Sequence, residues 1–236
     1  MESVTRRDFV KNSVAAGAVV AAATTVAASQ PVAPADGTVK ILAISCSPRQ
    51  GKTTATALGV CLQAAREVGP RIETELIELA GLKINGSLAA GIPLAEGERD
   101  DFPNLVPKLA DPKVRGIIIG TPVYFGNMSS LCRAFLERCI VLYQDKLALS
   151  NKVAGVVAVG GTRNGGQEVT IQSVQISLFC NEMILVGNGR PGPRHGATVW
   201  SGAEGGVLKD EIGMTTVKAL GRRVAEVALR VANSDR

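Results

Sequence analysis

The feature that most constrains the fold is a regular alternation of short apolar runs with longer helical patterns. Strands are expected at residues 38–46, 72–79, 114–120, 152–161 and 182–188, and helices at residues 54–68, 100–111, 128–143, 167–180 and 208–232. The runs 114–120 and 152–161 are apolar almost throughout, as in strands that are buried on both faces. This alternation predicts an α/β fold: a doubly wound, five-stranded parallel sheet with helices on both faces, in three layers.

The first 35 residues are set apart from this pattern. Arg6 and Arg7 are followed by Phe9 and then by an uncharged, alanine-rich run from residue 13 to residue 28. This order is typical of a twin-arginine export signal, and residues 33–35 (Ala-Pro-Ala) offer a cleavage site near Ala35. The alternative is an uncleaved anchor or a basic tail, although the run is short and mild for a membrane span. We therefore expect a signal peptide at residues 1–35, one domain at residues 36–236, the export machinery as a partner and a periplasmic or otherwise exported protein.

Composition excludes several classes of function for residues 36–236. This part holds 23 Lys and Arg against 19 Asp and Glu, a net charge of about +4, and its basic residues form no run. No nucleic acid partner is therefore expected. The cysteines contain no C-x-x-C pair, so no metal site is expected, and their odd number argues against a full disulfide framework. They are Cys46, Cys61, Cys132, Cys139 and Cys180.

The first loop, "CSPRQGKTT" at residues 46–54, joins a strand to a helix and can be interpreted in more than one way. Its end matches the nucleoside triphosphate loop G-x-x-x-x-G-K-[ST], but Cys46 replaces the first glycine, and no carboxylate follows residues 114–120 to hold magnesium. A C-x5-R phosphatase loop would need arginine where Lys52 stands. A site for one phosphate at the helix N-terminus fits best, with a plain strand–helix turn as the remaining alternative. Its candidate ligands are Ser47, Arg49, Lys52, Thr53 and Thr54.

Two more loops follow strands and should lie at the same edge of the sheet. In "GTPVYFGNMSS" two aromatic rings stand on a turn, where they can cover a flat ligand or touch a second subunit, although they could instead fill a corner of the core. In "GGTRNGGQE" four glycines allow the backbone to approach a ligand closely, although a surface hairpin is the alternative. The candidate ligand-binding residues are Pro122, Val123, Tyr124, Phe125, Gly126 and Asn127 in one loop, and Gly160, Gly161, Thr162, Gly165 and Gly166 in the other.

A ligand with one phosphate, a polar chain and a large flat ring fits the three loops together, and FMN has this structure. With Ser47-Pro48-Arg49 ahead of Thr53-Thr54, "TPVYFGNMSS" and "GGTRNGGQE", nearly all of residues 36–236 resembles the NADPH-dependent FMN reductases and their iron–sulfur flavoprotein branch. The resemblance implies a flavodoxin-like fold, with the FMN phosphate on the first loop and the isoalloxazine between the other two. Compared with the family, the first loop is tight, with Cys46 in place of a glycine. The iron–sulfur branch has a group of cysteines that residues 83–101 lack. An iron–sulfur cluster is therefore excluded, because its cysteine ligands are missing.

The resemblance further implies an oxidoreductase that takes electrons from NAD(P)H and passes them through the flavin to a small acceptor, as FMN or quinone reductases do. It also implies a homo-oligomer, either a dimer or a tetramer. No catalytic residue is assigned; Arg163 and Arg194 are candidate contacts for a nicotinamide phosphate, and His195 is expected in an exposed loop. Because NADPH is a cytoplasmic reductant, an exported form would need another donor. The competing interpretation is therefore a flavodoxin-like electron carrier reduced by a membrane or periplasmic partner, although a basic chain disfavours it.

Overall fold

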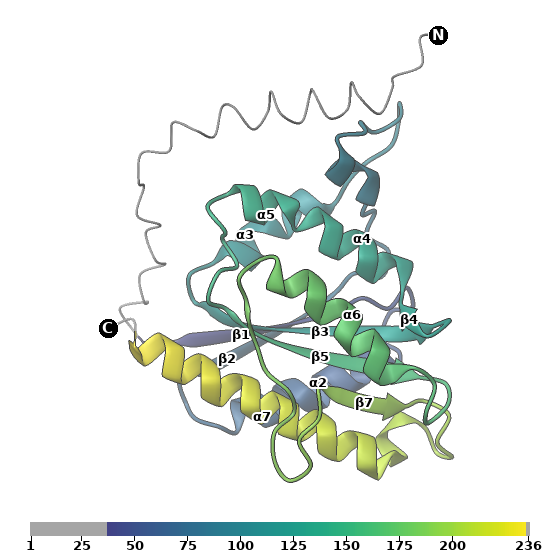
Figure 1. Cartoon of the computed structure of the whole chain (residues 1–236), viewed down its shortest axis with the longest axis vertical. Helices are drawn as coiled ribbons and strands as arrows, with labels where there is room; N and C mark the ends of the chain where they lie inside the picture. Colours follow the sequence, from purple (N-terminus) through teal and green to yellow (C-terminus); the bar gives the residue numbers. More distant parts are fainter. Residues whose placement is uncertain (1–36, 235–236) are drawn as a thin grey trace. The chain divides into compact units, whose positions relative to one another are not determined.

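A twisted sheet lies between two layers of helices in the computed structural model, which describes residues 37–234 (Figure 1). The predicted signal peptide at residues 1–35 falls outside this part. The sheet order is β2 (Ile72–Glu78), β1 (Val39–Ser45), β3 (Val114–Tyr124), β5 (Val153–Gly160) and β6 (Ile184–Leu185), with every neighbouring pair parallel. This order confirms the predicted α/β fold with a doubly wound parallel sheet.

The helices divide between the two faces of the sheet (Figure 1). On one face lie α2 (Thr53–Arg66) and α7 (Glu211–Ser234). On the other lie α3 (Val106–Ala110), α4 (Ser130–Arg138), α5 (Ile140–Gln144) and α6 (Gln167–Phe179). Short 3-10 turns complete the chain at η2 (Gly86–Ala90), η3 (Phe102–Asn104) and η4 (Val207–Lys209). No helix between residues 37 and 234 is long and apolar enough to cross a membrane.

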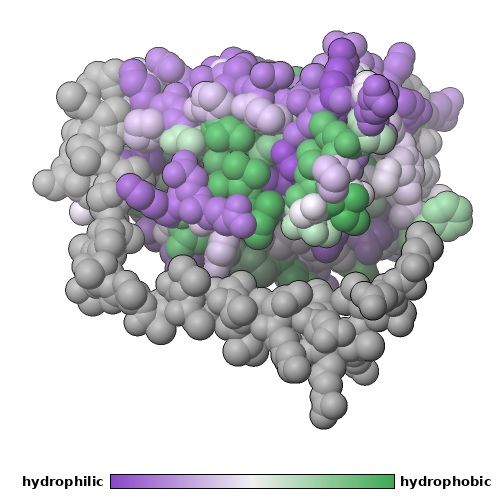
Figure 2. Space-filling model, turned by 90° about the horizontal axis from the view of Figure 1, so that it is seen from above, coloured by the Kyte–Doolittle hydropathy of each residue, from purple (hydrophilic) through white to green (hydrophobic). Residues whose placement is uncertain are grey.

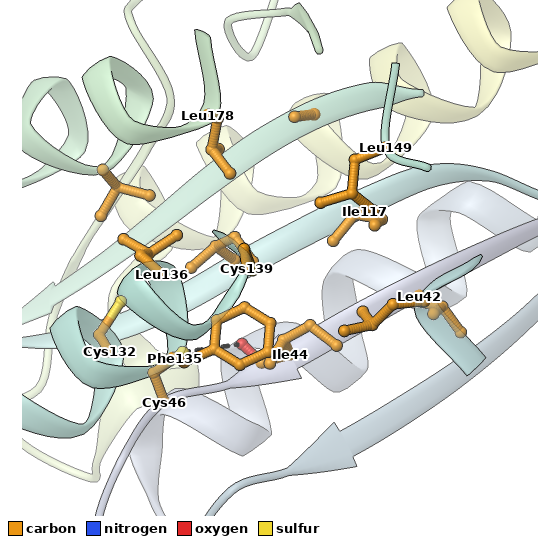
Figure 3. Packing of buried hydrophobic residues seen from close by; sticks show 14 of the residues in the cluster. Leu42, Ile44, Cys46, Ile117, Cys132, Phe135, Leu136, Cys139, Leu149 and Leu178 are labelled. Carbon is orange, nitrogen blue, oxygen red and sulfur yellow. Dashed lines mark hydrogen bonds between the residues drawn. The ribbon is translucent and has the colours of Figure 1, made fainter. Parts of the chain in front are cut away.

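Alternate residues of the central strands build two separate cores. In β1, Ile41 and Ala43 join the core beneath α2 and α7, whereas Leu42 and Ile44 join the core beneath α4 and α6. Figure 3 shows the second core, where Phe135 of α4 packs beside Ile44. Burying one such Leu, Ile or Phe side chain contributes about 1.5–3 kcal/mol. A strand that is apolar on both faces is thus stabilised from both helix layers, which explains the unbroken apolar runs.

Four elements differ from the sequence-based expectation. The helix predicted at residues 100–111 is the 3-10 turn η3 followed by the five-residue α3, in keeping with the two prolines in this stretch. Residues 197–200, predicted as part of a loop after the last strand, form β7 (Ala197–Trp200), which pairs in parallel with the carboxyl half of β5. The fifth strand is thus split into β6 and β7 by residues 186–196, whose glycines and prolines interrupt the pattern. The helix predicted at residues 128–143 is two helices that meet at Cys139. The loop after β3 contains β4 (Asn127–Met128), antiparallel to the end of β3.

The strand order places three loops together at one edge. The chain leaves β1 toward β2 and returns on the other side to β3, so the strand order reverses between β1 and β3. Ligands of doubly wound sheets bind beyond the carboxyl ends of the strands at such a point. Ser45, the last residue of β1, pairs with Gly120, and Pro122 pairs with Val159, so β3 and β5 continue a few residues beyond the end of β1. The loops after β1, β3 and β5 therefore share this edge.

Candidate functional site

The first loop is a tight turn that leads into α2 and leaves the helix end uncapped. Ser47 is buried, and its hydroxyl accepts a hydrogen bond of 3.1 Å from the backbone N–H of Arg49. Lys52, the N-cap residue of α2, makes no capping hydrogen bond with its side chain, and the first turn of α2 has no acidic residue. The amides at a helix N-terminus then need another acceptor, and a phosphate is a suitable one. The loop can therefore hold one phosphate, with the exposed Arg49 and Lys52 beside it.

In the first loop, one backbone amide already has a partner, and the cysteine does not suit a phosphatase. The backbone N–H of Gly51 donates a 2.8 Å hydrogen bond to the carboxylate of Glu78 at the end of β2, so this amide is already used. Cys46 is buried, and burial raises the pKa of its thiol well above the usual value, with Cys132 beside it adding to the shift. Figure 3 shows Cys46 and Cys132 at the same corner of the apolar core. A phosphatase nucleophile needs a thiolate of lowered pKa, so Cys46 does not suit that chemistry.

The second loop is a hairpin that projects beyond the sheet. β3 continues past its neighbours, and Tyr124 pairs with Asn127 across a two-residue turn formed by Phe125 and Gly126. Both turn residues have left-handed backbone angles, with φ of 49° for Phe125 and 73° for Gly126. A large aromatic residue rarely adopts such a conformation, which costs on the order of 1–3 kcal/mol. The Phe125 side chain is also fully exposed, at 110%. Strain and exposure in one residue make the ring a candidate for contact with another molecule.

Ser129 joins the second loop to the first. Its hydroxyl donates a 2.7 Å hydrogen bond to the carbonyl oxygen of Cys46 and accepts one of 3.0 Å from the N–H of Cys132, as the N-cap of α4. Its own N–H donates to the hydroxyl of Thr121 at 3.1 Å. Ser129 and Thr121 are both buried. One serine therefore fixes the start of α4, the end of β3 and the start of the first loop relative to one another.

The third loop touches the second through bare backbone. Gly166 has φ of 98°, and a Cβ atom added there would lie 2.9 Å from the Cα of Gly126. Only a glycine fits this contact, which we call the glycine seam (Gly126 and Gly166). The loop is braced from behind by the buried Gln167, whose amide donates to the carbonyl oxygen of Thr162 at 2.6 Å and accepts from the N–H of Gly165 at 2.8 Å.

A cluster at the start of α7 holds the same loop from its other side. The Trp200 indole donates to the carbonyl oxygen of Gly161 at 2.9 Å, and the Arg163 guanidinium lies 5.5 Å from the centre of the Trp200 ring. Arg163 also forms an ion pair with Asp210, whose side chain is fully buried. Asp210 accepts further hydrogen bonds from the backbone N–H groups of Trp200 at 2.7 Å and Gly213 at 3.0 Å.

The balance of these interactions sets the charge of Asp210. Burial alone would raise the pKa of its carboxyl group, but the hydrogen bonds from Arg163, Trp200 and Gly213 outweigh burial and hold the pKa below its usual value. Asp210 is therefore ionised at neutral pH. Arg163, which the sequence suggested as a contact for a nicotinamide phosphate, has a carboxylate partner inside the protein.

The structure brings the predicted site residues to one edge but at different depths. Pro122, Thr54 and Gly160 are buried with Ser47 behind the surface, and Val123, Thr53, Gly165 and Gly166 are half-buried. The remaining predicted residues are exposed at the loop tips: Arg49, Lys52, Tyr124, Phe125, Gly126, Asn127, Gly161 and Thr162. The side chains that can contact a ligand are thus mainly those of the exposed residues. His195 lies exposed in the turn before β7, in keeping with its predicted loop position.

Sequence reasoning missed the residues that position these loops. Ser129 carried a usable signal, since serine directly before a helical pattern is a common N-cap. Asp210 carried the same signal before α7, but its ion pair with Arg163 joins residues far apart in the chain. Nothing local marked Gln167 or Trp200. Between residues 37 and 234, no group of three or more His, Cys, Asp or Glu side chains is placed to hold a metal ion.

The three loops meet the needs of FMN on structural grounds. An uncapped helix end with a nearby guanidinium and ammonium group suits its phosphate. In the glycine seam, no heavy atom outside residues 125–127 lies within 4 Å of the point where a side chain of the exposed Gly126 would begin, so a ligand can approach backbone amides there, and the exposed Phe125 ring stands next to it. These are donors for the polar edge of a flat ring and an apolar surface for its face.

Comparison with known proteins also points to an FMN-binding protein. A sequence model of the NADPH-dependent FMN reductases matches residues 39–192. An iron–sulfur flavoprotein of Methanocaldococcus jannaschii is 38% identical over 192 residues, which cover 80% of this chain and 97% of that protein. An NAD(P)H dehydrogenase (quinone) of Aromatoleum aromaticum is 31% identical over 194 residues, covering 74% and 86%. A flavodoxin, WrbA-like protein from Agrobacterium tumefaciens has a similar fold, with a TM-score of 0.57 at 18% identity over 82% of this chain and 99% of that one. Since the family match spans β1 to β6 and all three loops, the chain belongs to the NADPH-dependent FMN reductase family.

Proposed function

We propose that this protein is an FMN-dependent oxidoreductase that accepts electrons from NAD(P)H and delivers them to a small acceptor such as a quinone or free flavin. The observation that carries the proposal is the glycine seam between the second and third loops, with the strained, exposed Phe125 next to it. The name of the relative from Aromatoleum aromaticum supports a quinone as the acceptor. Family membership supports NADPH as the donor.

The side chains have distinct roles in this proposal. Arg49, Lys52 and the amides at the start of α2 hold the phosphate, and Thr53 adds a hydroxyl group. We assign contact with the polar edge of the ring to backbone groups of Gly126, Asn127 and Gly161, which are exposed at the tips of the loops. FMN, when bound, supplies the redox chemistry, taking up a hydride from the nicotinamide and releasing electrons to the acceptor. The protein itself contributes position, local charge and shielding from water.

The test is an absorption spectrum of the purified chain followed by anaerobic addition of NADPH. A flavin band near about 450 nm that bleaches promptly would support the proposal. A flavin band that persists would indicate an electron carrier reduced by another protein. Absence of flavin after reconstitution with FMN would refute the site itself. The R49Q variant should bind FMN more weakly, whereas R66Q, which removes the same charge at the far end of α2, should bind it as the wild type does.

We also propose that electrons pass through the flavin alone. Residues 80–101 contain no cysteine, although relatives of this chain are named iron–sulfur flavoproteins. Metal analysis of anaerobically purified protein should find less than stoichiometric iron. Iron and acid-labile sulfide in stoichiometric amounts would contradict this expectation.

Assembly into a dimer or tetramer is a further part of the proposal. Large apolar side chains are exposed on the surface formed by α5 and α6: Ile140, Tyr143, Ile176 and Phe179. Figure 2 looks onto the molecule from above and shows hydrophobic areas set among hydrophilic residues. Such patches on a soluble surface often mark subunit contacts. Light scattering on a size-exclusion column measures the mass directly, and a monomer at micromolar concentration would contradict the assignment.

Export by the twin-arginine pathway, with cleavage near Ala35, remains a proposal that rests on residues 1–35 alone. Export of a folded, FMN-loaded protein would explain the use of this pathway. The physiological donor would then be a membrane or periplasmic redox partner. Cell fractionation tests this, and full-length protein found only in the cytoplasm would contradict it.

A further inference from the structure

A cavity lies on the outer flank of α7, away from the three loops. It measures about 630 Å³ and is formed by α7 and the segment from Asn188 to Pro193, which follows β6. Arg223 lies twelve residues after Glu211, the first residue of α7, which is about 18 Å along the helix axis. The cavity is therefore remote from Asp210 and the third loop. Its lining residues are Asn188, Gly189, Arg190, Pro193, Ala219, Arg222, Arg223, Glu226 and Arg230.

The charge of this lining is strongly positive. Four arginines and one glutamate surround the cavity, which we call the arginine cavity. Within residues 37–234, none of the four guanidinium groups forms a hydrogen bond or an ion pair, and Glu226 pairs with none of them. Elsewhere arginines do find carboxylates, as Arg133 does with Glu137 at 2.8 Å and Arg138 with Asp100 at 2.6 Å. The cavity therefore keeps an excess of positive charge, because Glu226 is the one carboxylate among its lining residues and pairs directly with none of the four arginines.

The two walls of the cavity are held in a defined arrangement. Asn188 is buried, and its side chain donates to the carbonyl oxygen of Gly192 at 3.1 Å and accepts from the N–H of Arg194 at 2.6 Å. These bonds fix the turn that carries Arg190. Gly189 packs on the stem of Arg223, since a Cβ atom added there would lie 3.6 Å from its Cγ and Cδ atoms. The turn thus presents Arg190 against the helix.

Helical spacing places the other arginines on the facing wall. Ala219, Arg223, Glu226 and Arg230 follow one another at intervals of four, three and four residues, which puts them on one stripe of α7. Arg222 lies at the edge of this stripe. The small side chain of Ala219 leaves room between the arginines and the turn. The guanidinium groups line the cavity from two sides, and their N–H groups are available as hydrogen-bond donors. They can bind an anion that bears several oxygen acceptors.

We propose that the arginine cavity binds phosphate-bearing anions with two neighbouring phosphate groups or an equivalent display of phosphates. Arginine pairs with phosphate through two parallel hydrogen bonds, and such pairs are stronger than neutral hydrogen bonds. Binding would offset the excess of positive charge in the cavity. The same chemistry is offered by a free pyrophosphate group and by the headgroups of an anionic membrane, and the experiment distinguishes them.

Calorimetric titration of FMN-saturated protein with inorganic pyrophosphate, at constant ionic strength set by chloride, measures this binding. FMN saturation keeps the first loop occupied, so that pyrophosphate cannot bind there. We expect one site with a dissociation constant below about 1 mM, and an affinity that falls at least about tenfold in R223Q/R230Q. R190Q, which changes only the exposed turn, should weaken binding as well. K83Q/R99Q is the matched control, because it removes the same charge from another surface cavity, and it should bind pyrophosphate as the wild type does.

The source of the phosphate is identified by sedimentation with vesicles of phosphatidylglycerol and phosphatidylcholine. Sedimentation that is lost in R223Q/R230Q and competed by pyrophosphate would assign the cavity to a membrane headgroup. Pyrophosphate binding without sedimentation would assign it to a free ligand. The proposal is overturned if wild-type protein binds neither probe, or if R223Q/R230Q and R190Q bind both as the wild type does.

Discussion

Replacing Ser129 with alanine tests whether one buried hydroxyl holds the first two loops together. The change removes the 2.7 Å hydrogen bond to the carbonyl oxygen of Cys46 and the 3.0 Å bond from the N–H of Cys132. Loss of an N-cap costs about 1 kcal/mol, and leaving a buried carbonyl oxygen without a donor costs about 1–3 kcal/mol. S129A should therefore lower the free energy of unfolding by about 2–4 kcal/mol. In a domain of this size the melting temperature should fall by about 4–16 °C.

Urea unfolding of the apo protein measures the loss of stability, and fluorescence titration with FMN measures the affinity for FMN. FMN affinity should fall because the start of the first loop loses its fixed position relative to β3. The matched control is S130A, since Ser130 is the exposed neighbour at the start of α4 and its removal should change stability by less than about 0.5 kcal/mol. If S129A unfolds at the same urea concentration as S130A, the serine does not join the loops and the reasoning fails.

Three further changes test other parts of the structure. D210N should lower the free energy of unfolding by about 1–3 kcal/mol at pH 7, because it weakens the interaction with Arg163. Since the pKa of Asp210 is lowered in the folded protein, the difference between D210N and the wild type in urea unfolding should shrink as the pH falls through that pKa. A difference that does not change with pH would contradict the argument. Burial, together with the charge of Arg115, lowers the pKa of Lys152 to about 8. K152M removes the charge of Lys152 and also the 2.9 Å hydrogen bond that the Nζ of Lys152 donates to the carbonyl oxygen of Asp111. Only the charge effect depends on pH, so the stability of K152M relative to the wild type should fall by up to about 3 kcal/mol as the pH rises from 8 to 10.5, and a difference that stays constant over this range would contradict the argument. F125G should relieve a strained turn and raise the apo stability by up to about 1 kcal/mol while weakening FMN binding, and unchanged FMN affinity would remove Phe125 from the site.

The central sheet and the placement of the loops followed directly from local patterns. The apolar runs that became β3 and β5 are buried on both faces, so their composition alone indicated central strands of a parallel sheet. Once those strands were assigned, chain order placed the loops after β1, β3 and β5 at one edge. Both predictions, of the central strands and of the common edge of the loops, depend only on short-range periodicity and on general rules of chain topology.

Other features depend on contacts between distant residues and left no local trace. β7 has only four residues and follows a segment rich in glycine and proline, so its pairing with β5 could not be predicted. The hydrophobic pattern runs unbroken through Cys139, which concealed the break between α4 and α5. The ion pair of Arg163 with Asp210 joins residues 47 positions apart, so no local pattern could predict it.

The burial of the cysteines divides the thiols of this protein into two chemical groups. Cys46, Cys61, Cys132 and Cys139 are enclosed in the two cores, whereas Cys180 is exposed at the end of α6. Burial raises the pKa of Cys61 and of Cys139 to about 12, so neither forms a thiolate at ordinary pH. The folded chain should therefore react with one equivalent of a thiol reagent, and the denatured chain with five. Cys180 is thus a built-in attachment point for a single fluorescent label, which could follow assembly at the α5–α6 surface without any engineered cysteine.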